Sequence, residues 1–358
     1  MNGKLSVPFS ARHHPIVVAA LVSAAAVSSY AAVPQAEVSE AAPWEVPRTS
    51  HGHPDLQGNW TNATLTPFQR PAGQGPVLTW EEVAEIEARQ IEMVARGAAP
   101  SDPNRAPQPA GGTISECIHS ATDCYNEVYR EPGERVAIVN GEPRSSLVTN
   151  PPDGRAPELT PEGRRRVDEY QELRSQFGPY DHPELRPDGE RCLVSFQSSA
   201  GPPMLPNYWY NNNYTIVQNA DHVVIMAEMV HDARIIRLGE PAALPRDVRP
   251  WFGDSWGRWE GNTLVVETTN LNPVHMFRGV SPSNDQKVIE RFTRVDEDTV
   301  VYEFTIDDPT IYTSVWGGQV PFERFDQPLY EFACHEANYS LSNVLSGARY
   351  QEMLAAQR

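Results

Sequence analysis

The sequence predicts a mainly β protein, an antiparallel β-barrel with two or three peripheral helices and long loops. From residue 208 onward, β-branched and aromatic runs alternate with turn residues. The 33 prolines and 23 glycines indicate many loops rather than a helical bundle. Antiparallel strands in this number must hide their edges, and closure into a barrel does so completely. A β-sandwich is the nearest alternative.

The N-terminus predicts export. Lys4 and Arg12 precede an apolar run from Ile16 to Tyr30, and small residues around Ala31 fit a signal-peptidase site. Residues 1–31 are therefore predicted to be a signal peptide, with a retained signal anchor as the alternative. We expect a periplasmic or secreted protein whose mature chain has no membrane span.

The net negative charge of the chain argues against some classes of binding partner. Loss of Lys4 and Arg12 with the signal peptide would change the formal charge from −18 to −20. Such an acidic surface repels nucleic acids and anionic membranes. We expect a small-molecule substrate or ligand instead, and no nucleic-acid partner.

Four cysteines, Cys117, Cys124, Cys192 and Cys334, predict two disulfides in an oxidising compartment. Three pairings are possible. The short spacing between the first two favours their pairing, which leaves Cys192 to bond with Cys334. No CxxC or paired-histidine spacing occurs, so we expect no metal site.

In chain order, residues 32–55 are predicted to be a leader, and residues 56–358 a single barrel domain. The first strand lies within 53–62, where the bulky Trp60 of a G-x-W arrangement would close one end of the barrel. Thr79 and Glu82 form a capping box for a helix near 79–97, whose partial apolar stripe comprises Val83, Ile86, Ile91 and Val94.

The middle of the chain adds a hairpin and a second helix. Asn140-Gly141 predicts a hairpin turn within 135–149. Thr160 and Pro161 predict the start of a helix that ends near residue 176.

The C-terminal half predicts a β-meander. Its strands are expected at 214–218, 222–229, 234–238, 263–270, 288–295 and 299–307, with closure by 321–336 and a final helix over 342–357. The run 223–229 is apolar on both faces, so we expect the helices to cover its outer side.

Four stretches together resemble a large family of exported bacterial β-rich proteins: "SLVTNPPDGRAPELTPEGRRR", "DSWGRWEGNTLVVETTN", "KVIERFTRVDEDTVVYEFTIDDPTIYT" and "LYEFACHEANYSLSNVLSGAR". This resemblance covers most of the mature chain and implies no particular activity. The G-x-W stretch is also similar to the opening strand of lipocalin-type barrels, which include carriers and cofactor-free enzymes. Fold alone does not decide between these functions.

Two stretches carry candidate chemistry. In an extended segment, Asp254, Trp256 and Arg258 share one face and could hold a polar ligand. The alternative is that Arg258 pairs with Asp254 or Glu260, while the tryptophans fill a barrel end.

The second stretch follows the predicted strand 222–229. Glu228 would continue the apolar row of Val224 and Met226, and burial would raise its pKa toward the range of a general acid or base. His231 is a further proton-transfer candidate, with Asp232 beside it. The alternative is a polar turn in which Glu228 forms a salt bridge with Arg234.

Further candidate binding residues have less specific sequence patterns. The loop around Tyr208, Tyr210, Asn213 and Tyr214 has the composition of a ligand-binding loop, or of an asparagine-rich turn beside core aromatics. Trp316 could form another wall. Three mid-strand carboxylates, Glu267, Glu290 and Glu303, are expected to form a solvated ladder outside the barrel rather than a polar interior.

These observations predict an exported enzyme without cofactor that acts on a small neutral organic molecule by acid–base chemistry, of the lyase or isomerase class. Glu228, His231 and Asp254 are its predicted proton-transfer groups, and Arg234 and Arg258 would stabilise developing negative charge. The sequence has no P-loop and no GxGxxG motif, which would indicate nucleotide chemistry. A non-catalytic small-molecule carrier is the alternative.

Overall fold

The computed structural model describes residues 44–97, 104, 131–194, 201–207, 211–239, 242–277, 279–336 and 338–357. The chain divides into two units, Met1–Pro43 and Trp44–Arg358, and all described residues belong to the second. The predicted signal peptide therefore lies outside the described residues. In the described part, no helix is both long and apolar enough to cross a bilayer.

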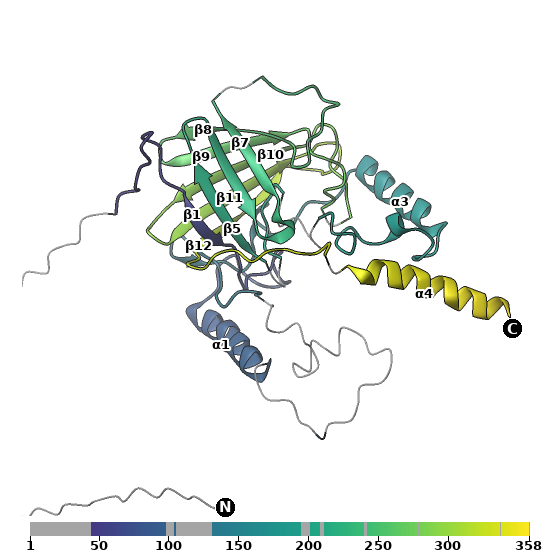
Figure 1. Ribbon diagram of the computed structural model, residues 1–358. Coiled ribbons are helices and arrows are strands. Elements are labelled where there is room, and N and C mark those ends of the chain that lie inside the picture. The colour runs from purple at the N-terminus through teal and green to yellow at the C-terminus, as the bar shows by residue number, and fades with distance from the viewer. Residues whose placement is uncertain are drawn as a thin grey trace, which may run out of the picture. The chain divides into compact units, whose positions relative to one another are not determined.

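Nine strands form a closed barrel, in the order β1-β5-β6-β7-β8-β9-β10-β11-β12, with β12 paired back to β1 (Figure 1). Their bounds are β1 Gly58–Thr61, β5 Asn213–Gln218, β6 His222–Ala227, β7 Ala233–Leu238, β8 Asp254–Glu260, β9 Thr263–Thr269, β10 Lys287–Arg294, β11 Thr299–Asp307 and β12 Trp316–Arg324. The predicted barrel is thus confirmed. It is mixed rather than purely antiparallel, because β7 and β8 are parallel.

The two ends of the barrel differ. At the end where β5 finishes, tight turns at 219–221, 261–262 and 295–298 join neighbouring strands. At the opposite end, which we call the loop end, the short connection 228–232 follows β6, and longer connections follow β9 and β11. The connection 239–253 returns from the turn end to the loop end, which is why β8 runs parallel to β7. The barrel thus has one short-looped and one long-looped end.

Trp60 fills the turn end, as the G-x-W arrangement predicts. Its side chain is fully buried, and its indole Nε1 donates to the Leu56 carbonyl at 2.9 Å. The guanidinium carbons of Arg294 and Arg324 lie 5.6 and 5.4 Å from its ring centroid. Cation–π attraction therefore adds to apolar burial at this end.

Short elements precede the meander. They are the hairpin strands β2 Ile138–Val139 and β3 Glu142–Pro143, strand β4 Val148–Asn150 beside β12, and the 3-10 helix η3 Pro183–Leu185. A second 3-10 helix, η4 Met229–His231, lies within the meander between β6 and β7. The hairpin turns at Asn140-Gly141, as predicted. Both residues have positive φ, 54° and 76°, which asparagine and glycine tolerate best.

Three α-helices occur in the described part: α1 Trp80–Gly97, α3 Pro161–Ser175 and α4 Tyr339–Ala356. The capping box is confirmed, because the Thr79 amide donates to Glu82 at 2.7 Å and the Glu82 amide donates to the Thr79 hydroxyl at 3.2 Å. The Thr160 hydroxyl caps α3 by accepting from the Gly163 amide. Asn338 caps α4, which therefore begins three residues before the predicted start.

Three expectations about packing and strand bounds are wrong. Only part of the α1 stripe is used, because Ile91 and Val94 are exposed. The outer faces of β6 and β7 are not covered, since Met226 and Ile235 are 42% and 59% exposed. The closing strand β12 begins at Trp316 and ends at Arg324, so the chain after residue 324 leaves the barrel.

Candidate functional site

A buried segment of the chain closes the loop end. Residues 201–207, which we call the plug, are all buried, and Met204 and Leu205 belong to the barrel core. The Met204 amide donates to the Tyr302 hydroxyl at 2.9 Å. The Asn207 amide donates to Asn212 Oδ1 at 2.7 Å, beside the start of β5. The plug thus separates the barrel interior from the loops at this end.

Beneath the plug lies a buried polar network centred on the ion pair Arg234–Glu290. Arg234 Nη1 donates to Glu290 Oε1 at 3.0 Å, and Nε donates to the Ser255 hydroxyl at 3.1 Å. The Tyr302 hydroxyl donates to Glu290 at 2.8 Å. Burial, and next the negative charge of Glu290, raise the pKa of Tyr302 well above its usual value. The network also includes Thr268, which accepts from Arg234 at 3.2 Å.

This network corrects two predictions. Arg234 pairs with Glu290, not with Glu228. Glu290 faces the interior rather than joining a solvated ladder, because it shares the inward row of β10 with Val288 and Phe292. Glu267 and Glu303 are partly exposed, and contact Lys287 and Gln319. The guanidinium is 2% exposed and the carboxylate 0%, so a ligand reaches neither unless the plug moves.

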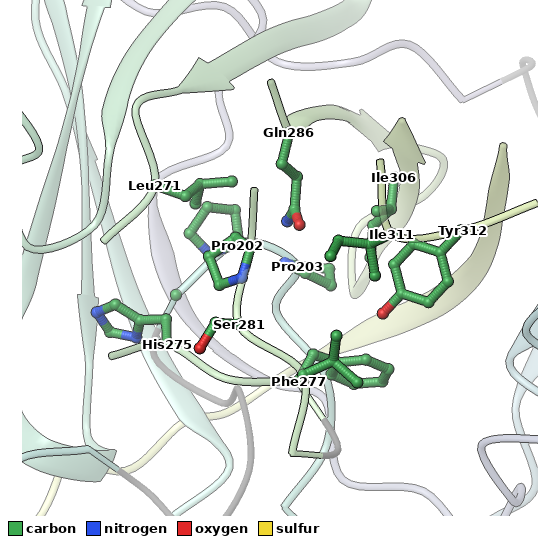
Figure 2. A pocket seen from close by; sticks show the side chains of 13 residues that line it. Pro202, Pro203, Leu271, His275, Phe277, Ser281, Gln286, Ile306, Ile311 and Tyr312 are labelled. Atoms are coloured by element: carbon green, nitrogen blue, oxygen red, sulfur yellow. The ribbon is translucent and has the colours of Figure 1, made fainter. Parts of the chain in front are cut away.

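A pocket opens at the loop end, between the plug and the connections that follow β9 and β11. Its cavity volume is only about 20 Å³, and the larger space of about 460 Å³ around it includes open solvent. Its wall is mostly apolar, as Figure 2 shows: Pro202, Pro203, Leu271, Phe277, Ile306 and Ile311. Three polar side chains, His275, Ser281 and Gln286, complete it together with Tyr312. A concave apolar wall with a few polar groups is typical of small-molecule sites.

His275 is the histidine that lines this pocket. Burial lowers its pKa to about 4, although a hydrogen bond with the Trp251 backbone opposes the shift. The imidazole is therefore neutral at physiological pH. Its Nε2 atom is buried and has no hydrogen-bond partner. The ring centroids of Trp251 and Phe252 lie 5.0 and 5.4 Å from the centroid of the imidazole. A neutral, unpartnered imidazole nitrogen can accept a proton or a hydrogen bond from a ligand.

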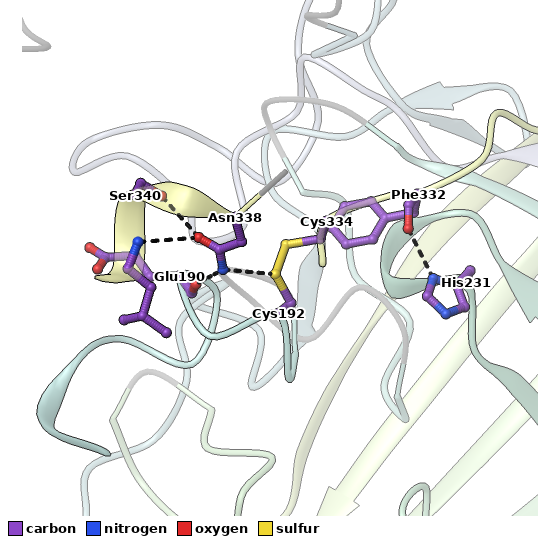
Figure 3. The surroundings of a disulfide bond; sticks show 8 residues. Glu190, Cys192, His231, Phe332, Cys334, Asn338 and Ser340 are labelled. Carbon is purple, nitrogen blue, oxygen red and sulfur yellow. Dashed lines mark hydrogen bonds between the residues drawn. A yellow bond between two sulfur atoms is a disulfide. The ribbon is translucent and has the colours of Figure 1, made fainter. Parts of the chain in front are cut away.

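The predicted proton-transfer residues Glu228 and His231 instead hold a C-terminal segment. Glu228 Oε1 accepts from the Tyr330 amide at 2.7 Å, and His231 Nδ1 lies 3.0 Å from the Phe332 carbonyl. Two residues further, Cys334 forms the disulfide with Cys192 (Figure 3). We call residues 330–334 the C-terminal strap.

Glu228 is 1% exposed, but not for the reason that its spacing predicts. The row of Val224 and Met226 faces outward, and Glu228 lies beyond the end of β6 under the strap. Its Oε2 accepts from Asn213 Nδ2 at 2.6 Å, and the same amide donates to Glu131 at 3.1 Å. Burial, with Glu228 nearby, raises the pKa of Glu131. Both oxygens of Glu228 therefore serve structural contacts.

We expect Glu228→Gln to lower the unfolding free energy by about 1–3 kcal/mol. Each carboxylate oxygen of Glu228 accepts an N–H, so the NH2 of glutamine deprives either Asn213 or Tyr330 of its acceptor. Chemical denaturation measures the loss, and amide exchange at Tyr330 should accelerate. The exposed Glu331→Gln is the matched control. Unchanged stability combined with abolished turnover would return Glu228 to the reaction.

The other predicted site residues on β8 do not form a pocket wall. Asp254 is buried, and it accepts from Arg237 and from the Leu244 amide, so it anchors the connection before β8. Trp256 and Arg258 lie on the outer face, where Arg258 pairs with Glu260. The inward row of β8 comprises Ser255, Gly257 and Trp259. Arg258 thus forms an ion pair with Glu260, the alternative to a role in ligand binding.

Residues 253–257 also match the pattern G-x-S-x-G, which in serine hydrolases marks a strained turn between a strand and a helix. Here Ser255 lies within β8, and its hydroxyl contacts Arg234 and Thr268 at 3.1 and 2.9 Å. It is 3% exposed. Neither the backbone nor these contacts fit a nucleophile elbow.

The predicted ligand-binding aromatics are divided. Tyr208 and Tyr210 lie outside the described residues. Tyr214 is buried, its ring stacks on Phe322, and burial raises the pKa of its hydroxyl. Trp316 is fully buried behind the pocket, where its ring contacts Phe277 and Tyr312 at 5.5 Å each. Only Trp316 thus adjoins the pocket.

The predicted bond between Cys192 and Cys334 is confirmed, and Cys117 and Cys124 lie outside the described residues. Within the described part, no group of three histidine, cysteine or acidic side chains is placed to hold a metal ion. Comparison of the chain with protein-family models and with curated proteins finds no match.

Sequence reasoning missed the pocket and His275. The histidine stands in a loop with no ligating or catalytic spacing around it, so periodicity carries no signal for it. Its surroundings come from the plug, from Trp251 and from the loops after β9 and β11, which only the fold brings together.

Proposed function

We propose that the protein is an exported enzyme, without a cofactor, that binds a small organic molecule in the loop-end pocket and transfers a proton with His275. The observation that supports this best is the neutral imidazole of His275, a residue that lines an otherwise apolar pocket and whose buried Nε2 has no hydrogen-bond partner. His275 takes the role that the sequence suggested for Glu228 and His231. We also propose that the chain belongs to the family of exported bacterial proteins that its motifs resemble. The barrel would then be of the lipocalin type.

The chemistry follows from the polar groups of the pocket. The imidazole nitrogen accepts a proton from a bound molecule, and the apolar wall keeps bulk water from competing for it. Ser281 and Gln286 orient the polar atoms of the ligand by hydrogen bonds. Elimination, hydration and isomerisation can each proceed with one group that takes a proton from one atom and returns it to another atom or to the leaving group, so the lyase or isomerase class fits this site best.

A carrier without catalysis is the second candidate. It is favoured by the mostly apolar wall, and by the engagement of Glu228, Asp254 and Glu290 in structural contacts. In a carrier, His275 would accept a hydrogen bond from the ligand and transfer no proton.

We expect His275→Gln to lower kcat about 10²–10⁴-fold on a substrate found by screening. Wild-type activity should stay constant from neutral pH down to about pH 5 and fall near pH 4, because protonation removes the base. The exposed His335→Gln is the control. Tight binding with no turnover of any ligand, in wild type and variant alike, would favour the carrier.

The pH dependence of the unfolding free energy tests the environment of His275 without a substrate. The folded-state pKa of His275 is depressed, so the unfolded chain takes up the proton first as the pH falls. The contribution of His275 to the unfolding free energy is therefore complete above about pH 6.5 and is lost between about pH 6.5 and 4. His275→Gln should abolish this component.

A further inference from the structure

Trp251 contacts His275 in two ways. The two rings meet edge to face, with centroids 5.0 Å apart and planes inclined by 69°. The Trp251 backbone also forms a hydrogen bond with the imidazole. Because Nε2 of His275 has no partner, Nδ1 is the ring nitrogen that makes this bond. The bond raises the pKa of His275, so the imidazole is the donor and the Trp251 carbonyl is the acceptor.

This hydrogen bond decides where the neutral imidazole carries its proton. The proton is on Nδ1, which donates to Trp251, and Nε2 keeps its lone pair. Only this tautomer has the acceptor at Nε2 that the proposed proton transfer needs. The place of the Trp251 carbonyl therefore determines which ring nitrogen of His275 can act as the base.

Trp251 is itself held by Asp232, the residue that precedes β7. The side chains of Trp251 and Asp232 form a hydrogen bond. The indole N–H can only donate, so the carboxylate of Asp232 is the acceptor. Burial raises the pKa of Asp232, against the opposing effects of nearby His231 and of this hydrogen bond. Asp232, Trp251 and His275 thus form a connected row that ends at the pocket.

The turn that carries Asp232 has a strained backbone. Val230 and His231 both have positive φ, 68° and 53°, a region that is especially unfavourable for a β-branched residue such as Val230. Strain of this kind persists only where surrounding contacts impose it, and it is concentrated at functional sites. The C-terminal strap supplies one such contact, because His231 Nδ1 lies 3.0 Å from the Phe332 carbonyl. The Ala227 amide supplies another by donating to the Asp232 carbonyl at 3.0 Å.

We propose that Asp232 and Trp251 are positioning residues for His275, and that their hydrogen bond keeps Nε2 of the imidazole without a proton. This inference rests on the proposed function and adds the partners of its base. Neither residue lines the pocket. Asp232 acts on Trp251, and Trp251 acts on the imidazole, so both work through contacts with the protein and not with the bound molecule.

NMR of the 15N-labelled protein without ligand tests this arrangement, because ring nitrogens with and without a proton have well separated 15N shifts. The spectrum of His275→Gln assigns the signals of His275. Wild type should contain mainly the Nδ1–H form near neutral pH. Trp251→Phe keeps an aromatic ring and the carbonyl but removes the donor to Asp232. A hydrogen bond of the usual net strength shifts an equilibrium about fivefold, so the ratio of Nε2–H to Nδ1–H should rise about two- to fivefold.

Two variants of Asp232 separate the hydrogen bond from the charge. Asp232→Asn keeps an oxygen for the indole N–H and should retain the wild-type ratio, whereas Asp232→Ala should shift it as Trp251→Phe does. Trp256→Phe, on the outer face of β8, is the matched control and should change nothing. An unchanged ratio in Trp251→Phe, or in a folded Asp232→Ala, would overturn the proposal. An effect of Asp232→Asn as large as that of Asp232→Ala would also overturn it, because the charge would then be the cause.

Turnover judges the proposed function separately. If the tautomer ratio responds as expected but no screened substrate is converted, the hydrogen bonds that position His275 stand and the enzyme is contradicted. If His275→Gln abolishes turnover but the ratio does not respond, the enzyme stands and the positioning residues are refuted. With an active wild type, Trp251→Phe should lower kcat about 10- to 100-fold and leave KM unchanged, the loss that outer partners of metal-binding imidazoles typically cause.

Discussion

Replacement of Glu290 by glutamine is expected to lower the unfolding free energy by about 3–5 kcal/mol, measured by chemical denaturation. Glutamine keeps the shape and an acceptor for Tyr302 but removes the charge that faces Arg234. Both members of the pair are almost wholly buried, so the remaining guanidinium would be an uncompensated cation in the barrel interior. The effect should be large because no water can replace the lost partner.

A double variant separates the charge from the packing. Arg234→Met combined with Glu290→Gln removes both charges, and it should be more stable than Glu290→Gln alone. Glu267→Gln is the matched control, because Glu267 pairs with Lys287 at 3.2 Å in a partly exposed position. That change should cost no more than about 1 kcal/mol. A double variant no more stable than the single one would show that the charge is not the cause.

Removal of the Cys192–Cys334 disulfide should lower the unfolding free energy by about 2–5 kcal/mol. The two cysteines are 142 residues apart, so the bond restricts a large part of the unfolded chain. The loss should therefore lie near the upper end of that range in the chain-entropy description. The double variant Cys192→Ser and Cys334→Ser measures it without reductant, which would also reduce the predicted bond between Cys117 and Cys124.

The same variant tests the C-terminal strap. The strap keeps its contacts with Glu228 and His231 when the disulfide is absent, but the bond no longer limits its motion. Amide exchange at Tyr330 should accelerate in the double variant, while exchange in β10 and β11 should follow only the global stability. A decrease of less than about 1 kcal/mol with unchanged exchange at Tyr330 would mean that side-chain contacts alone hold the strap.

The alternation along β10 shows how far the sequence could predict the interior. Val288 and Phe292 mark the inward face, and Glu290 stands between them with the same parity. The expectation of a solvated ladder was therefore wrong for Glu290, although its parity matches the apolar row, and no local pattern could name Arg234, which is 56 residues away. Glu228 shows the opposite case, because the apolar row that it was expected to continue faces solvent. Contacts with the C-terminal strap bury Glu228 instead.

By itself, the sequence determined the features that depend on neighbouring residues. These are the strand runs and their turns, the caps of α1 and α3, the Asn140-Gly141 hairpin and the indole at the turn end of the barrel. Local patterns predict them because their hydrogen bonds and backbone angles involve residues a few positions apart. The parallel β7–β8 pair, the buried ion pair, the plug and the surroundings of His275 were decided only by the tertiary structure. Each depends on contacts between segments tens of residues apart, and no periodicity in the chain encodes which distant side chains will meet.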